Sequence, residues 1–258
     1  MAIDSSGNLD VFYGTTNIRV STYHPSTNVW TSAAIPDAYI YNNQTFGKIV
    51  TAGNFLFLPK NGNGESVRYD LTTGTSIVFG ASINEDAIDY SIGPDGQLYV
   101  LSGAGVPSGD QVRVYNPSTL SLVRTISLNS FSFSLGTVRD LIVRPDGKML
   151  FSDSNSGKII LTDSNGSKLS EYAGSRHNSI VDIAMGSDGK LAQFGDDHKV
   201  YLFDANMNAI QQFFATSATG KPGMGLIVPS SVPEPSSIVV IGIAAVGLIV
   251  RRRRNKPN

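Results

Sequence analysis

The chain has 258 residues, of which 16% are charged, and it contains 26 glycines, 12 prolines and no cysteine. Aspartate outnumbers glutamate 17 to 4, which is typical of turns, and residues 1–231 carry 15 basic and 20 acidic side chains. The lack of cysteine excludes disulfides and thiolate metal sites, and a mildly acidic domain without a basic stripe argues against nucleic-acid binding. No long amphipathic helical pattern precedes residue 236, so we expect one all-β domain over residues 1–229.

A repeat with a spacing of 42 to 51 residues runs through this domain. Three copies place one Asp seven residues before a turn glycine and a second Asp directly before that glycine; they span Asp89–Gly96, Asp140–Gly147 and Asp182–Gly189. Two degenerate copies are centred on Gly7 and Gly53. Because a tight hairpin needs a positive φ angle at its centre, each glycine predicts a hairpin between two short strands.

The second half of the unit repeats as well. Val20–Thr27 aligns without a gap on Val112–Thr119, and each is a short strand that ends in an Asx/Pro turn. A fourth strand follows these turns, and we expect it at Thr75–Phe79, Leu122–Leu128, Lys168–Tyr172 and Ala209–Phe214. Four strands in 40–50 residues predict a β-propeller of about five visible blades, which can be part of a six-bladed ring.

The fourth unit, Val138 to Gly174, resembles an NHL-type repeat. The resemblance rests on Asp140, on Pro145-Asp146-Gly147, on Phe151-Ser152-Asp153 and on Gly157-Lys158-Ile159. It implies an NHL-like propeller domain.

The C-terminal residues 230–258 differ from the repeats in every respect. Val232-Pro233-Glu234-Pro235 comes first, Ile238 to Val250 follows without a charge, and Arg251-Arg252-Arg253-Arg254 closes the stretch. As a helix, the uncharged residues would span roughly 20 Å, which is shorter than the hydrocarbon core of a membrane at about 30 Å. Including Ser236 and Ser237 in the helix, and letting the apolar stems of the arginines lie in the membrane, brings the two lengths closer. Four arginines favour the cytoplasmic side of a membrane.

This order of parts resembles the PEP-CTERM sorting signal of Gram-negative bacteria. The resemblance implies a recognition motif at 232–235, a transmembrane helix at about 236–250 and a basic tail at 251–258. It also implies processing by an exosortase, a membrane protease, and delivery to the envelope or outside, often in species that produce exopolysaccharide. A plain tail anchor with a chance Pro-Glu-Pro, on a domain that stays in the cytoplasm, is the alternative.

An exosortase substrate is expected to begin with a secretory signal peptide. Met1–Ser6 has neither a charged n-region nor an apolar h-region, and the repeat predicts an Asp seven residues before Gly7, at position zero. We therefore expect a longer native product, with a signal peptide and a further blade or part of one at the N-terminus.

Asp89, Asp140 and Asp182 begin the innermost strands of their units. As functional residues, these carboxylates would line a central channel and bind a cation or a polar ligand. As structural residues, they would accept hydrogen bonds from backbone amides and tie adjacent blades together, which is the commoner role for a residue shared by several repeats.

Catalytic candidates are sparse. Arg176 and His177, in a loop between blades, are the best pair for a propeller lyase or lactonase, while His24 and His198 lie in turns. No HExxH, nucleophile elbow or P-loop occurs, and the Gly-rich loops Asn61–Glu65 and Gly103–Asp110 lack calcium-loop spacing. We expect no metal site, no cofactor and no catalytic residue.

These features predict an exported, surface-associated β-propeller that binds polysaccharide or another envelope protein. A secreted propeller lyase or lactonase with the same tail is the alternative.

Overall fold

The computed structural model describes twelve ranges of the chain: 2–3, 7–13, 19–35, 49–59, 65–80, 86–103, 111–128, 138–153, 156–173, 180–186, 188–195 and 199–214. Over these residues the fold is all-β. The strands form five four-stranded antiparallel sheets, and within each sheet neighbouring strands follow one another in chain order. We name the sheets blades A to E.

Every blade is a meander of four short strands. Blade A holds β1 (Ala2–Ile3), β2 (Leu9–Tyr13), β3 (Arg19–His24) and β4 (Val29–Ala34), and blade B holds β5 (Val50–Ala52), β6 (Phe55–Pro59), β7 (Ser66–Asp70) and β8 (Ser76–Phe79). Blade C holds β9 (Asp86–Ile92), β10 (Leu98–Gly103), β11 (Gln111–Tyr115) and β12 (Leu122–Ser127). Blade D holds β13 (Val138–Val143), β14 (Met149–Asp153), β15 (Lys158–Thr162) and β16 (Lys168–Ala173), and blade E holds β17 (Ile180–Met185), β18 (Leu191–Gly195), β19 (Lys199–Phe203) and β20 (Ala209–Phe214).

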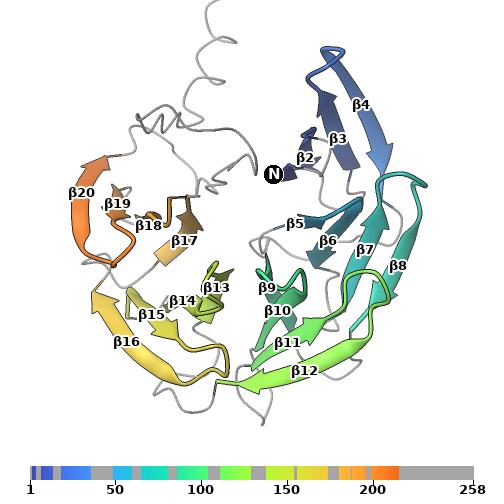
Figure 1. The fold of residues 1–258 in the computed structure, drawn as a ribbon. Coiled ribbons are helices and arrows are strands. Elements are labelled where there is room, and N and C mark those ends of the chain that lie inside the picture. Colours follow the sequence, from blue (N-terminus) through green and yellow to red (C-terminus); the bar gives the residue numbers. More distant parts are fainter. Residues whose placement is uncertain are drawn as a thin grey trace, which may run out of the picture.

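The blades are arranged as in a β-propeller. Figure 1 shows them following one another around a common centre, with the first strand of each blade towards the centre and the fourth at the rim. Within an antiparallel meander the first and third hairpins lie at the same end of the sheet. These two hairpins of every blade therefore share one end, which we call the turn face.

The seams between consecutive blades form the hydrophobic core. Val20 of blade A packs with Leu56 and Val67 of blade B, and separate clusters fill the seams from B to C, C to D and D to E. At the B–C seam the Phe79 ring lies 5.4 Å from the Tyr115 ring in an edge-to-face contact. Fully burying such a side chain contributes about 1.5–3 kcal/mol, so each blade is stabilised mainly by its neighbours.

The glycines that mark the repeat adopt the conformation expected of them. Gly7, Gly53, Gly96, Gly147 and Gly189 all have positive φ angles, between 60° and 79°. The predicted fourth strands are also present, as β8, β12, β16 and β20. The predicted turn glycines and fourth strands are therefore confirmed.

No helix within the described ranges is long and apolar enough to cross a membrane. The predicted transmembrane helix at about 236–250 lies outside those ranges.

Candidate functional site

Asp89 joins two blades. Its side chain is fully buried at the first strand of blade C, and its Oδ2 accepts the backbone N–H of Leu141, on the first strand of blade D, at 2.7 Å. Two residues further along, the hydroxyl oxygen of Ser91 accepts the N–H of Val143 at 3.0 Å. No β-ladder joins two blades within the described ranges, so these side chains connect the two innermost strands.

Asp140 makes its described contacts inside its own blade. The Ser152 hydroxyl donates to Asp140 Oδ2, while the Asp140 backbone N–H donates to Ser152 Oγ at 3.1 Å. This reciprocal pair connects β13 to β14 at a buried position. Asp89 thus bonds to the next blade, and Asp140 bonds to a serine of its own blade.

Asp182 is the third aligned aspartate, and it is 9% exposed on the first strand of blade E. Among the described residues, no three His, Asp or Glu side chains lie close enough together to hold a metal ion. The three aligned aspartates, Asp89, Asp140 and Asp182, therefore do not form one cation site within the described ranges. Their role as channel carboxylates stays a prediction.

The other predicted site residues mostly lie outside the described ranges. This applies to Arg176, to His177 and His198, to the glycine-rich loops except for their end residues, and to the whole tail with its motif, apolar segment and arginines. His24 is described, and its ring nitrogens lie 3.2 Å from Asn8 Oδ1 and 3.2 Å from Thr31 Oγ1. The ring therefore bonds to neighbouring residues of its own blade, which is a structural role. The lyase or lactonase hypothesis has no described residue to test it.

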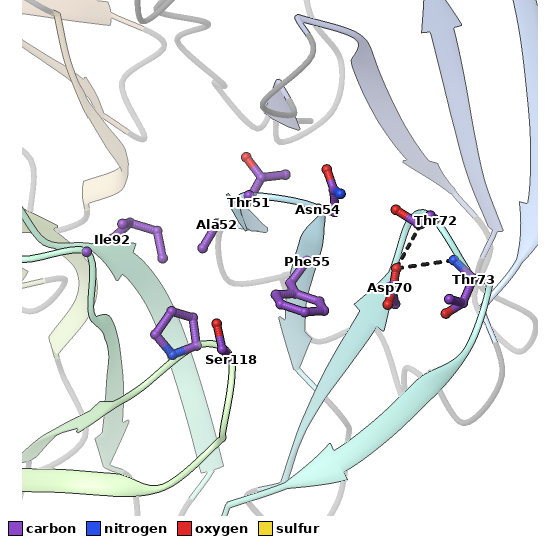
Figure 2. A pocket seen from close by; sticks show the side chains of 12 residues that line it. Thr51, Ala52, Asn54, Phe55, Asp70, Thr72, Thr73, Ile92 and Ser118 are labelled. Atoms are coloured by element: carbon purple, nitrogen blue, oxygen red, sulfur yellow. Dashed lines mark hydrogen bonds between the residues drawn. The ribbon is translucent and has the colours of Figure 1, made fainter.

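A pocket of about 680 Å³ lies on the turn face, at the seam between blades B and C. Blade B contributes Thr51–Phe55, Asp70, Thr72 and Thr73, and blade C contributes Ile92, Gly96, Pro117 and Ser118. Figure 2 shows the Phe55 ring near the middle of the pocket, with Asp70 on one side and Ile92 and Ser118 on the other.

The pocket exists because blade B has a short first hairpin. Ala52 pairs directly with Phe55, so only Gly53 and Asn54 form the turn, whereas Gly93–Gln97 separates the paired residues of blade C. The hairpins of blades A, D and E have the same longer form as that of blade C. Because the first hairpin of blade B is shorter than those of the other blades, space is left over the seam between blades B and C.

Strand pairing also corrects the alignment of blade B with the other blades. Leu56 pairs with Tyr69 and Leu98 pairs with Tyr115, and both tyrosines directly precede an Asx turn. Asn54, and not Gly53, therefore corresponds to Gly96. The repeat alignment centred on Gly53 was off by one residue, because the shorter turn also carries a glycine with positive φ.

Two side chains at this seam depart from the repeat. Phe55 occupies a place that is polar in the other four blades, held by Asn8, Gln97, Lys148 and Lys190. Arg68 occupies a place that is uncharged in all of them, held by Thr22, Val114, Leu161 and Leu202. Blade B therefore has an apolar residue where the other blades have a polar one, and a charge where they have none.

Arg68 connects blade B to blade C. Its Nη1 donates to the backbone carbonyl of Pro117 at 3.3 Å and to that of Ser118, while its guanidinium carbon lies 4.3 Å from the centre of the Phe55 ring. A cation over an aromatic face is attracted by the electron-rich ring. The arginine therefore holds both the ring and the carbonyls of the opposite wall in place.

Asp70 shapes the second wall of the pocket. Its Oδ1 accepts the backbone N–H groups of Thr72 at 2.8 Å and of Thr73 at 3.2 Å, as the dashed lines in Figure 2 show. Burial, the largest single influence, would raise the pKa of Asp70, but these amides, the Thr73 hydroxyl and the Arg68 cation together lower it. Asp70 is therefore an ionised carboxylate at neutral pH.

This pocket was not among the sites predicted from the sequence. A signal for it does exist, because Arg68 directly precedes Tyr69-Asp70 where an apolar residue precedes the same turn in blades C, D and E. The place of Arg68 can be read from the sequence alignment of these turns, whereas the place of Phe55 requires the strand pairing, because the first hairpin of blade B was misaligned.

Solved structures resemble the fold of this chain at low sequence identity. A protein of unknown function from Bacteroides caccae matches 83% of this chain and 74% of its own, with a TM-score of 0.60 and 13% identity. The Dos1 propeller matches 84% of this chain, which spans 60% of that protein, with a TM-score of 0.57 and 15% identity. Because 1049 solved chains match in all, the likeness supports a propeller fold and no particular activity.

A search of the curated proteins found no similar sequence. One family model does match, the PEP-CTERM protein-sorting motif, over residues 231–254. The matched stretch contains the Pro-Glu-Pro motif, the uncharged segment and all four arginines. The chain therefore carries a PEP-CTERM sorting motif after a propeller-like domain, and this motif implies export and processing by an exosortase.

Proposed function

We propose that this protein is a β-propeller that is exported, held briefly in the inner membrane by its tail, and released or attached at the cell envelope or surface. There it acts as a binding or matrix protein whose ligand is a polysaccharide or an envelope protein. The match to the PEP-CTERM motif at residues 231–254 is the observation that carries this proposal.

In this proposal the parts of the tail have separate roles. Val232–Pro235 is the element that the exosortase recognises, Ile238–Val250 crosses the membrane as a helix, and Arg251–Arg254 stays on the cytoplasmic side. The domain covers residues 1–229 and has NHL-like blades. The sequence motifs of the fourth unit support this assignment.

A binding role is preferred to catalysis because of what the aligned carboxylates do. The Asp89 carboxylate accepts a backbone amide of the next blade, and that of Asp140 accepts a serine hydroxyl of its own blade. A general acid or base needs a carboxylate that can reach a substrate. Aspartates used in this way support the blades, and specificity is left to residues that depart from the repeat.

Mass spectrometry of the protein isolated from its native host tests the sorting role. We expect a mature C-terminus close to Pro233-Glu234-Pro235, without the four arginines. Replacing Glu234 with Ala should leave the arginines on the protein, because the recognition element is incomplete. The matched control is Pro229→Ala, which changes a proline just outside the motif and should leave processing intact.

Two results would overturn the proposal. One is an unprocessed chain that remains in the cytosolic fraction. The other is a C-terminus that is trimmed equally in the Glu234→Ala and Pro229→Ala variants, because trimming would then not depend on the motif.

A further inference from the structure

The pocket between blades B and C combines a fixed aromatic ring with polar groups on two walls. We propose that this pocket binds one unit of a neutral polysaccharide, with Phe55 as the surface on which the sugar ring stacks. This inference rests on the proposed binding role and names its site and its ligand class.

Phe55 and Arg68 are not needed to build a blade. The other four blades are built with polar residues at the first place and uncharged residues at the second. A partly exposed phenylalanine and a cation inside a seam each have a cost in folding, since one leaves apolar surface in water and the other desolvates a charge. Phe55 lines the pocket and Arg68 lies against its ring while joining blades B and C, and blades A, C, D and E do without this pair, which indicates a use in addition to building the seam.

The ring is held in a fixed orientation. The Arg68 guanidinium lies over it at 4.3 Å, and Arg68 itself is bound to the carbonyls of Pro117 and Ser118. A preorganised aromatic surface loses little conformational entropy when a ligand stacks on it. The C–H groups on one face of a pyranose form an apolar surface of similar size to this ring, and stacking removes both surfaces from water.

The walls supply groups suited to sugar hydroxyls. Thr51 and Asn54 come from β5 and its turn, Asp70 from the end of β7, Thr72 from the turn that follows, and Ser118 from blade C. A pyranose presents hydroxyls around its edge while its face stays apolar, so one ring and a rim of polar groups match its two kinds of surface. The volume of about 680 Å³ lies within the range of about 300–1,000 Å³ that is usual for ligand pockets.

The charges favour a neutral ligand over an acidic one. Among the described residues that line the pocket, Asp70 is the ionisable one, and its carboxylate is ionised at neutral pH. The Arg68 cation lies on the Phe55 ring and directs Nη1 to two carbonyls. A uronic acid would therefore bring its carboxylate near Asp70, and like charges repel.

Binding is measured on the full chain, purified in a mild detergent. The probes are immobilised neutral hexasaccharides of glucose, galactose, mannose and N-acetylglucosamine, together with a hexamer of galacturonic acid. We expect at least one neutral hexasaccharide to bind, and to bind more tightly than the acidic hexamer. Phe55→Ala should weaken that binding by at least about tenfold, whereas Phe55→Trp should retain it.

The repeat itself provides the sharpest variant and its control. Phe55→Lys combined with Arg68→Leu installs the residues that blade D carries as Lys148 and Leu161, so the seam should still form while sugar binding is lost. Lys148→Ala changes the same place in blade D and should leave binding unchanged. Thermal unfolding of each variant shows whether the fold is retained.

Three outcomes overturn the inference: no neutral hexasaccharide binds, the acidic hexamer binds more tightly, or binding survives the double substitution in a folded chain. Binding of an envelope protein through this pocket, with no affinity for any of the sugars, would also reject it. None of these results bears on processing of the tail, which mass spectrometry tests separately.

Discussion

At the scale of single residues, the buried carboxylate of Asp89 shows how a propeller joins sheets that share no ladder. It receives the N–H of Leu141 from the next blade, at 0% exposure. Replacing it with Ala should leave that N–H buried without an acceptor. We expect Asp89→Ala to lower the free energy of unfolding by about 1–3 kcal/mol, measured by urea denaturation of the full chain.

Asp95→Ala is the comparison for this prediction. Asp95 is an exposed turn residue whose carboxylate accepts the N–H of Gln97 and the hydroxyl of Tyr99. Water can replace the carboxylate at the exposed turn, and the Tyr99 hydroxyl keeps its bond from Arg124. A loss of stability in Asp89→Ala no larger than that in Asp95→Ala would mean that the contact between blades C and D does not depend on the carboxylate.

Which residues share the repeat could be predicted, but their partners could not. Asp89 and Asp140 stand at the same distance from their turn glycines, but the bond from Asp89 to the next blade and the bond from Asp140 to Ser152 are not visible in the repeat. The first depends on how blade D sits against blade C, and the second on the serine in β14. Leu141 lies far along the chain from Asp89, and no local pattern relates the two.

At the scale of elements, the first and third hairpins of blade D differ in how closely their turn glycines approach blade C. Gly166, in the turn between β15 and β16, has a φ angle of 87°, and a Cβ there would lie 2.7 Å from Ile126 Cγ2 and 2.9 Å from the Ser127 carbonyl oxygen. Gly147, in the turn between β13 and β14, has a φ angle of 79° with nothing within 4 Å of such a Cβ.

These two glycines separate backbone strain from packing. Gly147→Ala should cost about 1 kcal/mol through the positive φ angle alone. Gly166→Ala should cost more, by a further 1 kcal/mol or so, because a backbone carbonyl of blade C cannot move away freely. Paired thermal melts of the two variants check this, and equal losses would show that the turn does not press on blade C.

Hairpins that follow the repeat could be predicted at this scale, and the one that departs from it was misaligned. Gly96, Gly147 and Gly189 each lie in a turn of the longer form, and their sequences align without a gap. In blade B the turn has only Gly53 and Asn54. Its glycine therefore lies one residue before the position that the turn glycine occupies in the other blades. The pocket was missed for the same reason, since it depends on that short turn.

At the scale of the whole molecule, the sequence predicted the class of fold because a period of 42 to 51 residues, with four strands in each unit, reappears as five meanders. The contacts between blades could not be predicted in the same way. They come from side chains such as Val20 and Leu56, which meet only once the blades stand side by side. The Pro-Glu-Pro tail was recognisable without any fold, since its parts are contiguous in the sequence.

The aspartates of the turns give the molecule a predictable response to acid. Asp70, Asp146, Asp163, Asp188 and Asp204 each accept a backbone N–H two residues further on. Hydrogen bonds from amides or nearby cations lower the pKa of all five below the ordinary value of 3.8, and hydrogen bonds from Lys158 and Lys168 lower the pKa of Glu171 from 4.5 to about 2. Turn carboxylates are thus spread over blades B, D and E.

A carboxylate whose pKa is lower in the folded chain stabilises that chain at every pH above its unfolded pKa, and the contribution disappears as the pH falls through the folded value. We therefore expect the melting temperature of the full chain to be nearly constant from pH 7 to pH 5, to begin falling near pH 4.5, and to go on falling towards pH 2. Circular dichroism melts at low ionic strength measure this. Asp163→Asn, which keeps an oxygen acceptor for the turn amides but cannot titrate, should make the fall shallower. A melting temperature that drops already between pH 7 and pH 6, or that stays constant down to pH 2.5, would mean that groups other than these turn carboxylates control stability in acid.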